Sequence, residues 1–147
     1  MRKLNALLIL CFALLFASAV YGQTGVNNAE LNGNYAFTFS GMSGNGSFSS
    51  VFAAVGRFTA DGVGNLTNGQ LDTNAVGGGG AAQAFTGTYS IGADNRGLMT
   101  LNFSGSSAKL AFAMLANGNA QFIEFDASGG AGTIGSGTME KADATAY

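Results

Sequence analysis

Apolar and polar residues alternate with a period of two along most of the chain. Tyr35, Phe37 and Phe39 are separated by small or polar residues. The same pattern recurs over residues 85–91, 97–103 and 110–114. Such alternation is typical of β-strands with one apolar face. We therefore predict eight strands and one short helical turn, at residues 28–31. The strands are expected near residues 34–40, 50–60, 64–74, 83–91, 96–104, 107–116, 119–126 and 132–141.

Short turns separate these strands. Residues 61–65 and 92–97 carry the Asp, Asn and Gly residues of tight turns, and looser loops are expected at 41–48, 75–82 and 127–131. Short connections favour antiparallel pairing between successive strands. Closing the meander removes its two free edges. The predicted fold is all-β, an eight-stranded antiparallel up-and-down β-barrel, with a two-sheet β-sandwich as the alternative because alternation fits both.

The first residues have the pattern of a secretory signal peptide. A basic start at Arg2 and Lys3 is followed by an apolar run to Val20 and then by small residues. Cleavage is expected after Gly22 or Ala19, and a membrane anchor is the alternative. The predicted organisation is a signal peptide at 1–22, a lead-in at 23–32, the barrel at 33–141 and a tail at 142–147. The mature protein is expected to be secreted or periplasmic.

Composition excludes several classes of chemistry. The chain has no His, no Trp, no Pro and one Cys, which lies in the signal. Imidazole bases, Ser-His-Asp triads, His-based metal sites and internal disulfides are therefore absent. Without the signal, four basic and eight acidic residues give a net charge of −4. That charge does not favour nucleic acid or an anionic membrane surface.

Several segments carry a family resemblance. They are LNGNYAFTFSG, VGRFTADGVGNLTNGQLD, FTGTYSIGADNRGLMTLN and LANGNAQFIEFD followed by GTIGSGTMEK. From about Leu31 to Lys141 the chain resembles an uncharacterised family of secreted β-rich domains from soil acidobacteria. The resemblance implies export and a β-rich fold, and it carries no catalytic residues across. In topology alone the chain is similar to the calycins, the lipocalin- and avidin-like barrels. Gly33-Asn34-Tyr35 stands where those families usually have Gly-x-Trp.

The aromatic face supplies the candidate site. We expect its side chains to line the barrel interior, with any cavity shallow and near the loops at 41–48 and 75–82. The expected function is a non-catalytic module that binds a small apolar ligand or a surface partner, with no cofactor or metal. The alternatives are a structural or adhesive module with a packed interior and a small outer-membrane barrel with this face toward lipid. The candidate lining residues are Tyr35, Phe37, Phe39, Phe85, Tyr89, Phe103 and Phe112.

Three polar groups are weaker candidates. Glu124 and Asp126 share one strand face at a spacing that a glycosidase pair could use. We expect them on the solvated face, with Ile123 and Phe125 inside. The oxygen-bearing residues from Asp61 to Asp72 are spaced partly as in a calcium-binding loop, but Val63 offers no ligand and Leu66 stands where the loop needs Gly. A hairpin turn explains the segment better. Arg57 and Asp72 lie on adjacent predicted strands, and Phe58 on the opposite face favours a surface pair over a buried or pocket-lining ion pair.

Overall fold

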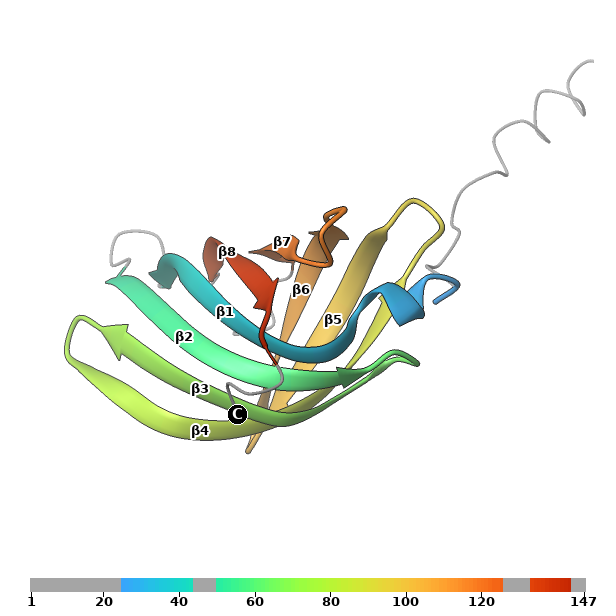
Figure 1. Ribbon diagram of the computed structural model, residues 1–147. Coiled ribbons are helices and arrows are strands. Elements are labelled where there is room, and N and C mark those ends of the chain that lie inside the picture. Colours follow the sequence, from blue (N-terminus) through green and yellow to red (C-terminus); the bar gives the residue numbers. More distant parts are fainter. Residues whose placement is uncertain (1–24, 44–49, 126–132, 144–147) are drawn as a thin grey trace, which may run out of the picture.

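The protein is a closed barrel of eight antiparallel strands in up-and-down order (Figure 1). The computed structural model describes residues 25–43, 50–125 and 133–143. The predicted barrel is confirmed, and the predicted helical turn is the 3-10 helix η1. The signal segment, the cleavage sites, Asp126 and the end of the tail lie outside the described residues. The elements are η1 (Asn28–Glu30), β1 (Asn32–Ser43), β2 (Ser50–Asp61), β3 (Asn65–Ala75), β4 (Gly78–Ile91), β5 (Arg96–Phe103), β6 (Ser106–Met114), β7 (Ala120–Glu124) and β8 (Ile134–Lys141).

Strand β1 closes the sheet. It pairs with β2 from Asn32↔Asp61 to Ser43↔Ser50, and with β8 from Tyr35↔Lys141 to Met42↔Ile134. A two-sheet sandwich has no such pairing between its first and last strands, so closure excludes that alternative. Closure also supplies partners for backbone groups that an open sheet would leave at two edges. Within the described residues, no helix is long and apolar enough to span a membrane.

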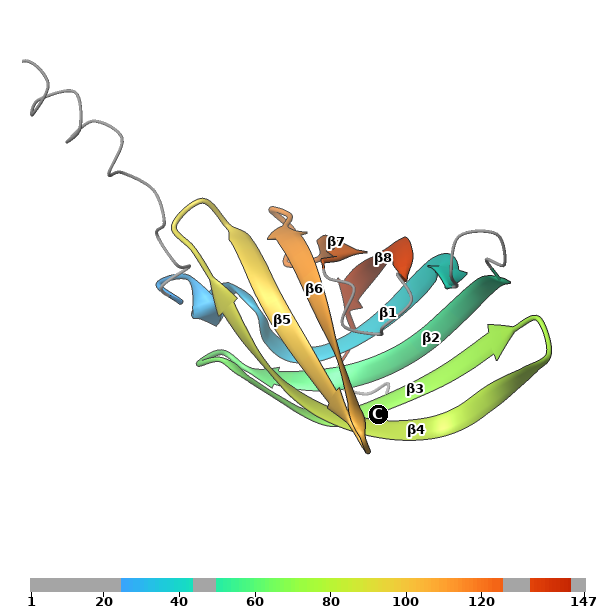
Figure 2. The ribbon, with the colours of Figure 1, turned by 180° about the vertical axis from the view of Figure 1, so that it is seen from behind.

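The strands differ in length, which makes the barrel uneven (Figures 1 and 2). Strands β1 to β4 have 11 to 14 residues, whereas β5 to β8 have five to nine. Strand β4 pairs with β3 from Gly78 but with β5 only from Thr86. The loop predicted over residues 75–82 is therefore wrong. A short turn with positive φ at Gly77 and Gly78 lets β4 begin there instead.

The aromatic face of the strands points into the barrel. Tyr35, Phe37 and Phe39 are at most 8% exposed, whereas Ala36 and Thr38 between them are exposed. The same alternation holds on β4, where Phe85 is buried and Thr86 exposed. This arrangement does not fit the alternative in which the aromatic face meets lipid. The core forms because each strand buries every second side chain.

Glycines opposite the aromatic rings make the narrow interior possible. A Cβ atom added at Gly97 would lie 2.1 Å from Cζ of Phe112, and one at Gly137 would lie 2.4 Å from Cζ of Phe122. Each ring thus lies over a backbone that has no side chain, because a ring and a Cβ could not both occupy the space. Four such pairs face each other across neighbouring strands: Gly56 with Phe37, Gly69 with Phe85, Gly97 with Phe112 and Gly137 with Phe122.

One end of the barrel is closed by η1 and the residues around it. The hydroxyl of Tyr89, from inside the barrel, lies 2.7 Å from the carbonyl oxygen of Leu31. Burial raises the pKa of Tyr89, so this hydroxyl stays a protonated donor. The Asn28 side chain accepts from the Ile91 amide at 2.8 Å and donates to the Val63 carbonyl at 3.2 Å. These bonds tie η1 to two of the turns at this end.

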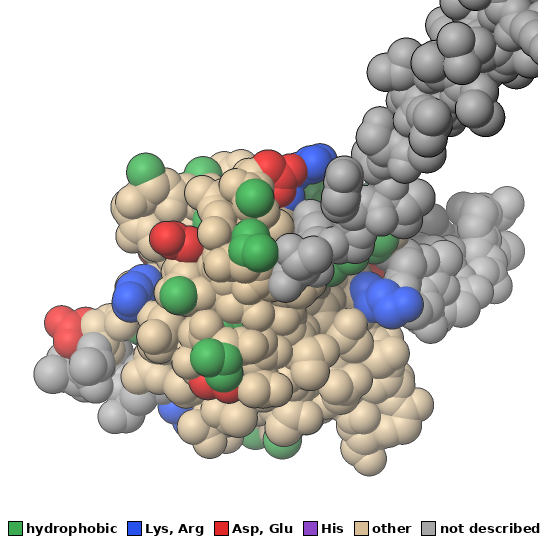
Figure 3. Space-filling model, turned by 90° about the vertical axis from the view of Figure 1, so that its right-hand side faces the viewer, with side chains coloured by type: hydrophobic (Ala, Val, Ile, Leu, Met, Phe, Trp, Pro, Cys, Tyr) green, Lys and Arg blue, Asp and Glu red, His purple; other side chains and the backbone are tan. Residues whose placement is uncertain are grey.

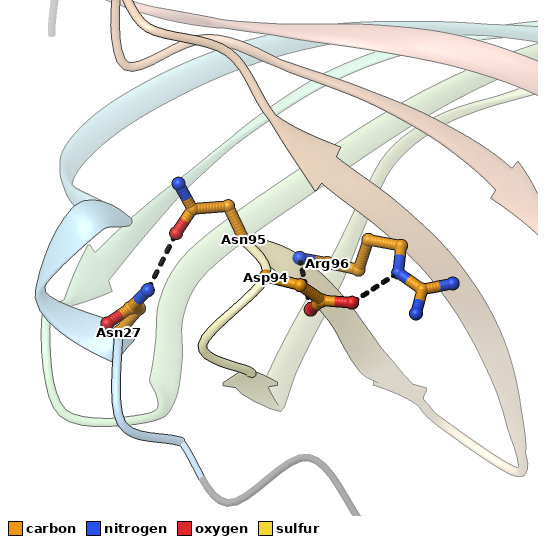
Figure 4. A network of polar contacts seen from close by, with 4 residues as sticks. All are labelled: Asn27, Asp94, Asn95 and Arg96. Atoms are coloured by element: carbon orange, nitrogen blue, oxygen red, sulfur yellow. Dashed lines mark hydrogen bonds and ion pairs between the residues drawn. The ribbon is translucent and has the colours of Figure 1, made fainter.

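The β4–β5 turn is held to the same segment. Asn27 donates to the side chain of Asn95 at 2.7 Å, and Arg96 pairs with Asp94 at 2.6 Å (Figure 4). Hydrogen bonds from Arg96 lower the pKa of Asp94. Both members of that ion pair are at least half exposed, so it contributes little to stability. On the side of the molecule that carries η1, the hydrophobic side chains in view are scattered (Figure 3).

Asp61 organises the β2–β3 turn. Its Oδ1 accepts from the amides of Val63, Gly64 and Asn65 at 2.8–3.0 Å, and its Oδ2 accepts from the Asn65 side chain at 2.6 Å. The carboxylate of Asp61 therefore stabilises the turn, as expected if this segment is a hairpin and not a calcium loop. Within the described residues no group of three or more His, Cys, Asp or Glu side chains could hold a metal ion.

The Asp61 turn should make stability depend on acid pH. Hydrogen bonds, first from the Asn65 amide and side chain, lower the pKa of Asp61 from 3.8 to about 2. The folded-state pKa lies below the unfolded value, so the contribution is complete above about pH 4 and is lost as pH falls through about 2. Urea unfolding at pH 5 and pH 2.5 measures this loss. Asp61→Asn should reduce the pH dependence of the free energy of unfolding, whereas Glu140→Gln, on the exposed face of β8, should not. The assignment is contradicted if the wild type and both variants lose the same free energy of unfolding between pH 5 and pH 2.5.

Candidate ligand-binding site

The end of the barrel opposite η1 holds an apolar cavity of about 190 Å³ among the described residues. It lies at the end where β1 joins β2 and β3 joins β4, opposite η1. Phe39 and Phe52 form one wall, with ring centroids 5.4 Å apart. Phe103, on β5, packs against Phe85 on β4, with ring centroids 5.5 Å apart. The residues that line the cavity are Phe37, Phe39, Phe52, Ala54, Leu71, Thr73, Leu101, Phe103, Ser107, Ala108, Leu110, Phe122, Glu124 and Thr133.

Below this cavity the barrel is packed. A void of only about 10 Å³ remains among side chains that include Phe37, Phe58, Met99 and Met139. That volume is about the minimum for one water molecule. Tyr35 stacks on Phe58 at 5.5 Å, which fills the interior toward the closed end. A ligand entering from the mouth therefore meets a floor about halfway into the barrel, at Phe37.

The structure places the seven predicted lining residues inside the barrel but brings only three to the cavity. Phe37, Phe39 and Phe103 line it. Tyr35, Phe85, Tyr89 and Phe112 are buried in the packed interior instead. Sequence reasoning missed Phe52, Leu71, Leu101, Leu110 and Phe122 as lining residues. Phe52 could have been found by extending the period of two back along β2 from Phe58, which places both rings on one face.

The prediction for β7 is wrong about which face is inside. Ile123 and Phe125 are 53% and 57% exposed, whereas Phe122 is buried and Glu124 lines the cavity. Strand pairing explains the reversal. Phe122 is paired with Phe112 on β6, and residues paired across antiparallel strands lie on the same face. On its other side Phe122 is paired with Gly137, which leaves space for its ring.

Arg57 and Asp72 lie on the outer face, as expected, but each has another partner. Arg57 donates through Nε and Nη2 to the side-chain oxygen of Gln70, at 3.1 and 2.8 Å. Asp72 accepts from the amide of Ala82, a non-glycine residue with a φ of 53°. The carboxylate of Asp72 therefore holds the backbone of β4 at the point where the register between β3 and β4 shifts. This cluster borders an outer depression of about 280 Å³.

A larger hollow of about 920 Å³ lies on the outer face of β6, β7, β8 and β1. Many side chains that point into it are small and neutral, such as Thr38, Ser40, Ser136 and Thr138, and they are exposed; the larger side chains of Arg96, Gln121 and Ile123 also line it. Exposed small side chains offer a ligand little desolvated surface. The cavity at the mouth is smaller, but its walls are mostly apolar and include five Phe rings, which favours binding of a small molecule.

Comparisons of the chain with protein-family models, with characterised proteins and with solved structures find no match. A function assigned to the cavity therefore rests on its own side chains.

Proposed function

We propose that the protein is an exported, non-catalytic module that binds a small apolar ligand in the mouth of its barrel. The observation that supports the proposal is a difference in side-chain packing along the barrel axis. Side chains fill the interior below Phe37, whereas an apolar cavity of about 190 Å³ remains above it. A module that served only as a rigid spacer would need no such cavity.

The cavity volume limits the ligand. An apolar cavity of about 150 Å³ is large enough for benzene, and sites for drug-sized molecules span about 300–1,000 Å³. A volume of about 190 Å³ fits one ring with a short substituent. Long-chain lipids and polycyclic compounds would have to extend out of the cavity. The ligand class proposed is therefore a monocyclic aromatic or a short branched aliphatic molecule.

The lack of His, and the position of the single Cys within the segment expected to be a signal peptide, support a binding role over catalysis. Glycoside hydrolysis uses two carboxyl groups flanking one bond. Glu124 is at the mouth, and Asp126 lies outside the described residues. One observation favours the structural or adhesive alternative, namely that aromatic packing fills most of the interior.

Filling the cavity should abolish binding. Ala54 is partly buried and lines the cavity, so Ala54→Leu places a branched side chain where the ligand would lie. Toluene binding, followed by NMR titration of the protein, should weaken by about tenfold or more, which corresponds to about 1.4 kcal/mol. Circular dichroism of the variant checks that the barrel remains folded.

Ala53→Leu is the matched control. Ala53 is the neighbouring residue on β2, and it is exposed on the outer face. The same substitution there should leave toluene binding unchanged. The proposal fails if toluene and related monocyclic compounds do not bind the wild-type protein, or if both variants bind toluene as tightly as the wild type.

A further inference from the structure

Strand β4 leaves one edge of the sheet unpaired at the mouth of the barrel. It pairs with β3 from Gly78, whereas its pairing with β5 begins only at Thr86. Residues 78–84 therefore have a strand on one side alone, and all of them are exposed. Beyond the tip of the β5–β6 hairpin, β4 continues beside β3 only (Figure 2). The backbone groups that point away from β3 over this stretch have no strand partner among the described residues.

Hydrogen bonds to β3 show which backbone groups face this free edge. The amide of Gly80 donates to the Thr73 hydroxyl at 3.2 Å. The amide of Ala82 donates to the Asp72 carboxylate. Both amides thus point toward β3. Because successive amides of a strand alternate in direction, the amide of Ala81 between them points to the free edge. Unpaired amides and carbonyls along an edge are a template for another strand.

This edge lacks the features that usually keep strand edges from pairing. Natural proteins protect exposed edges with charged side chains, especially Lys, or with Pro. No charged residue occurs from Thr73 to Ala93, and the chain has no Pro. Residues 78–84 are Gly and Ala except for Gln83, so their side chains do not hinder an approaching backbone. The edge is therefore accessible to a strand of almost any sequence.

The free edge of β4 lies beside the apolar cavity. Leu71 and Thr73 line the cavity from β3. They are paired with Gln83 and Gly80 of β4. Phe103, the last residue of β5, lines the cavity from the other side of β4. A strand added to the free edge would continue the line of β5, and every second side chain of that strand would point inward, toward the cavity.

We propose that the mouth binds an extended peptide, whose backbone pairs with the free edge of β4 and whose one apolar side chain, of Phe or Leu, fills the cavity. This inference rests on the proposed function, since it names the ligand class of the same cavity. The side chain of Phe is a benzyl group and that of Leu is an isobutyl group, and both fit a volume of about 190 Å³. In this mode of recognition the main-chain hydrogen bonds supply affinity and the pocket supplies specificity.

A second copy of this chain fits the site less well than a peptide does. Its own free edge carries only Gly, Ala and Gln side chains, so two such edges paired together would leave both cavities empty. The register shift also places Ala81 and Ala82 opposite the single residue Asp72, and a bulge of this kind twists the strand. A short flexible peptide follows a twisted edge more easily than an equally rigid edge does.

Three blocked pentapeptides test the two parts of the proposal. The probe is acetyl-Thr-Thr-Phe-Thr-Thr-amide. One control has Thr in place of Phe, and the other keeps Phe but carries N-methyl groups on its amides, so it cannot donate backbone hydrogen bonds. In NMR titrations the probe should bind about tenfold more tightly than either control, which is the effect of one or two net hydrogen bonds. Toluene is titrated alongside as the probe of the cavity alone.

The outcomes separate this inference from the proposed function. If toluene binds but the probe binds no more tightly than the N-methylated peptide, this inference is overturned and the proposed function stands. If neither toluene nor the probe binds, both fail. The probe should also slow hydrogen exchange of the Ala81 amide, whereas toluene should not. Protection of this amide that rises with protein concentration in the absence of peptide would show that a second copy occupies the edge, and would overturn the inference.

Substitution of Ala81 tests the edge itself. Ala81 is exposed and does not line the cavity, so Ala81→Pro removes the edge-facing amide and leaves the cavity intact. Its affinity for toluene should equal that of the wild type, whereas its affinity for the probe should fall about tenfold. Ala81→Gly keeps the amide and should keep both affinities. An Ala81→Pro protein that binds toluene and still binds the probe as tightly as the wild type contradicts the assignment. The comparison of the Phe peptide with its N-methylated form tests the same pairing in the wild-type protein, whatever the stability of Ala81→Pro.

Discussion

Phe37→Asp should prevent the protein from folding. Phe37 lies at the centre of the aromatic core, with ring centroids 6.0 Å from Phe58, 6.2 Å from Phe85 and 6.3 Å from Phe122. Truncation of a buried Phe alone costs about 3–5 kcal/mol. A carboxylate at that position adds several kcal/mol more, because its charge would be desolvated among aromatic rings. The total is comparable to the whole stability of a small domain, about 5–15 kcal/mol.

Thr88→Asp is the control, because Thr88 is exposed on β4 and its neighbours in the sequence are inward-facing. We expect this change to cost less than about 1 kcal/mol, as most exposed substitutions do. Far-UV circular dichroism and urea unfolding of the purified variants measure both effects. A folded Phe37→Asp protein beside an unfolded Thr88→Asp protein would mean that the strand faces are reversed.

Gly97→Val should destabilise the barrel by about 3 kcal/mol or more, the upper range for overpacked cores. A Cβ at position 97 would lie 2.1 Å from Cζ and 2.4 Å from Cε1 of the Phe112 ring. Phe112 is 4% exposed and packed within the core, so its ring cannot move aside freely. Gly97→Ala should have a smaller effect of the same sign. Urea unfolding measures the free energy of unfolding of each variant.

Two further proteins distinguish a steric clash from a general intolerance of substitution. Gly80→Ala places a Cβ near only the side chain of Thr73, on an exposed part of β4, and should change stability by less than about 0.5 kcal/mol. Phe112→Leu should partly rescue Gly97→Ala, with a coupling energy of about 0.5–3 kcal/mol in a double-mutant cycle. Additive effects would show that the ring and the glycine do not compete for space.

The strand faces could be predicted from the sequence wherever one face is clearly apolar. On β1 the alternation of Tyr35, Phe37 and Phe39 with small residues leaves only one way to bury the rings. The barrel followed because eight strands with short connections have few other ways to pair their edges. These features depend on local patterns, which a single sequence displays directly.

The face of β7 could not be predicted in the same way. Its segment offers an aromatic residue on each face, Phe122 on one and Phe125 on the other. The choice depends on pairing with Phe112 and on the space above Gly137, both of which are far away in the sequence. Glu124 was misplaced for the same reason. The candidate site was therefore only partly visible, because Glu124, the charged residue among its described lining residues, lies on the strand with the weakest local pattern.

The glycines that face an aromatic ring on the neighbouring strand also restrict how this sequence can change over evolutionary time. A glycine at position 69 or 97 can become larger only if the aromatic residue on the adjacent strand becomes smaller, since both fill the same space. Related proteins should therefore exchange the two partners together, or swap which strand carries the ring. Linked substitutions of this kind would record the strand register in the sequences themselves, at positions that are about 15 residues apart.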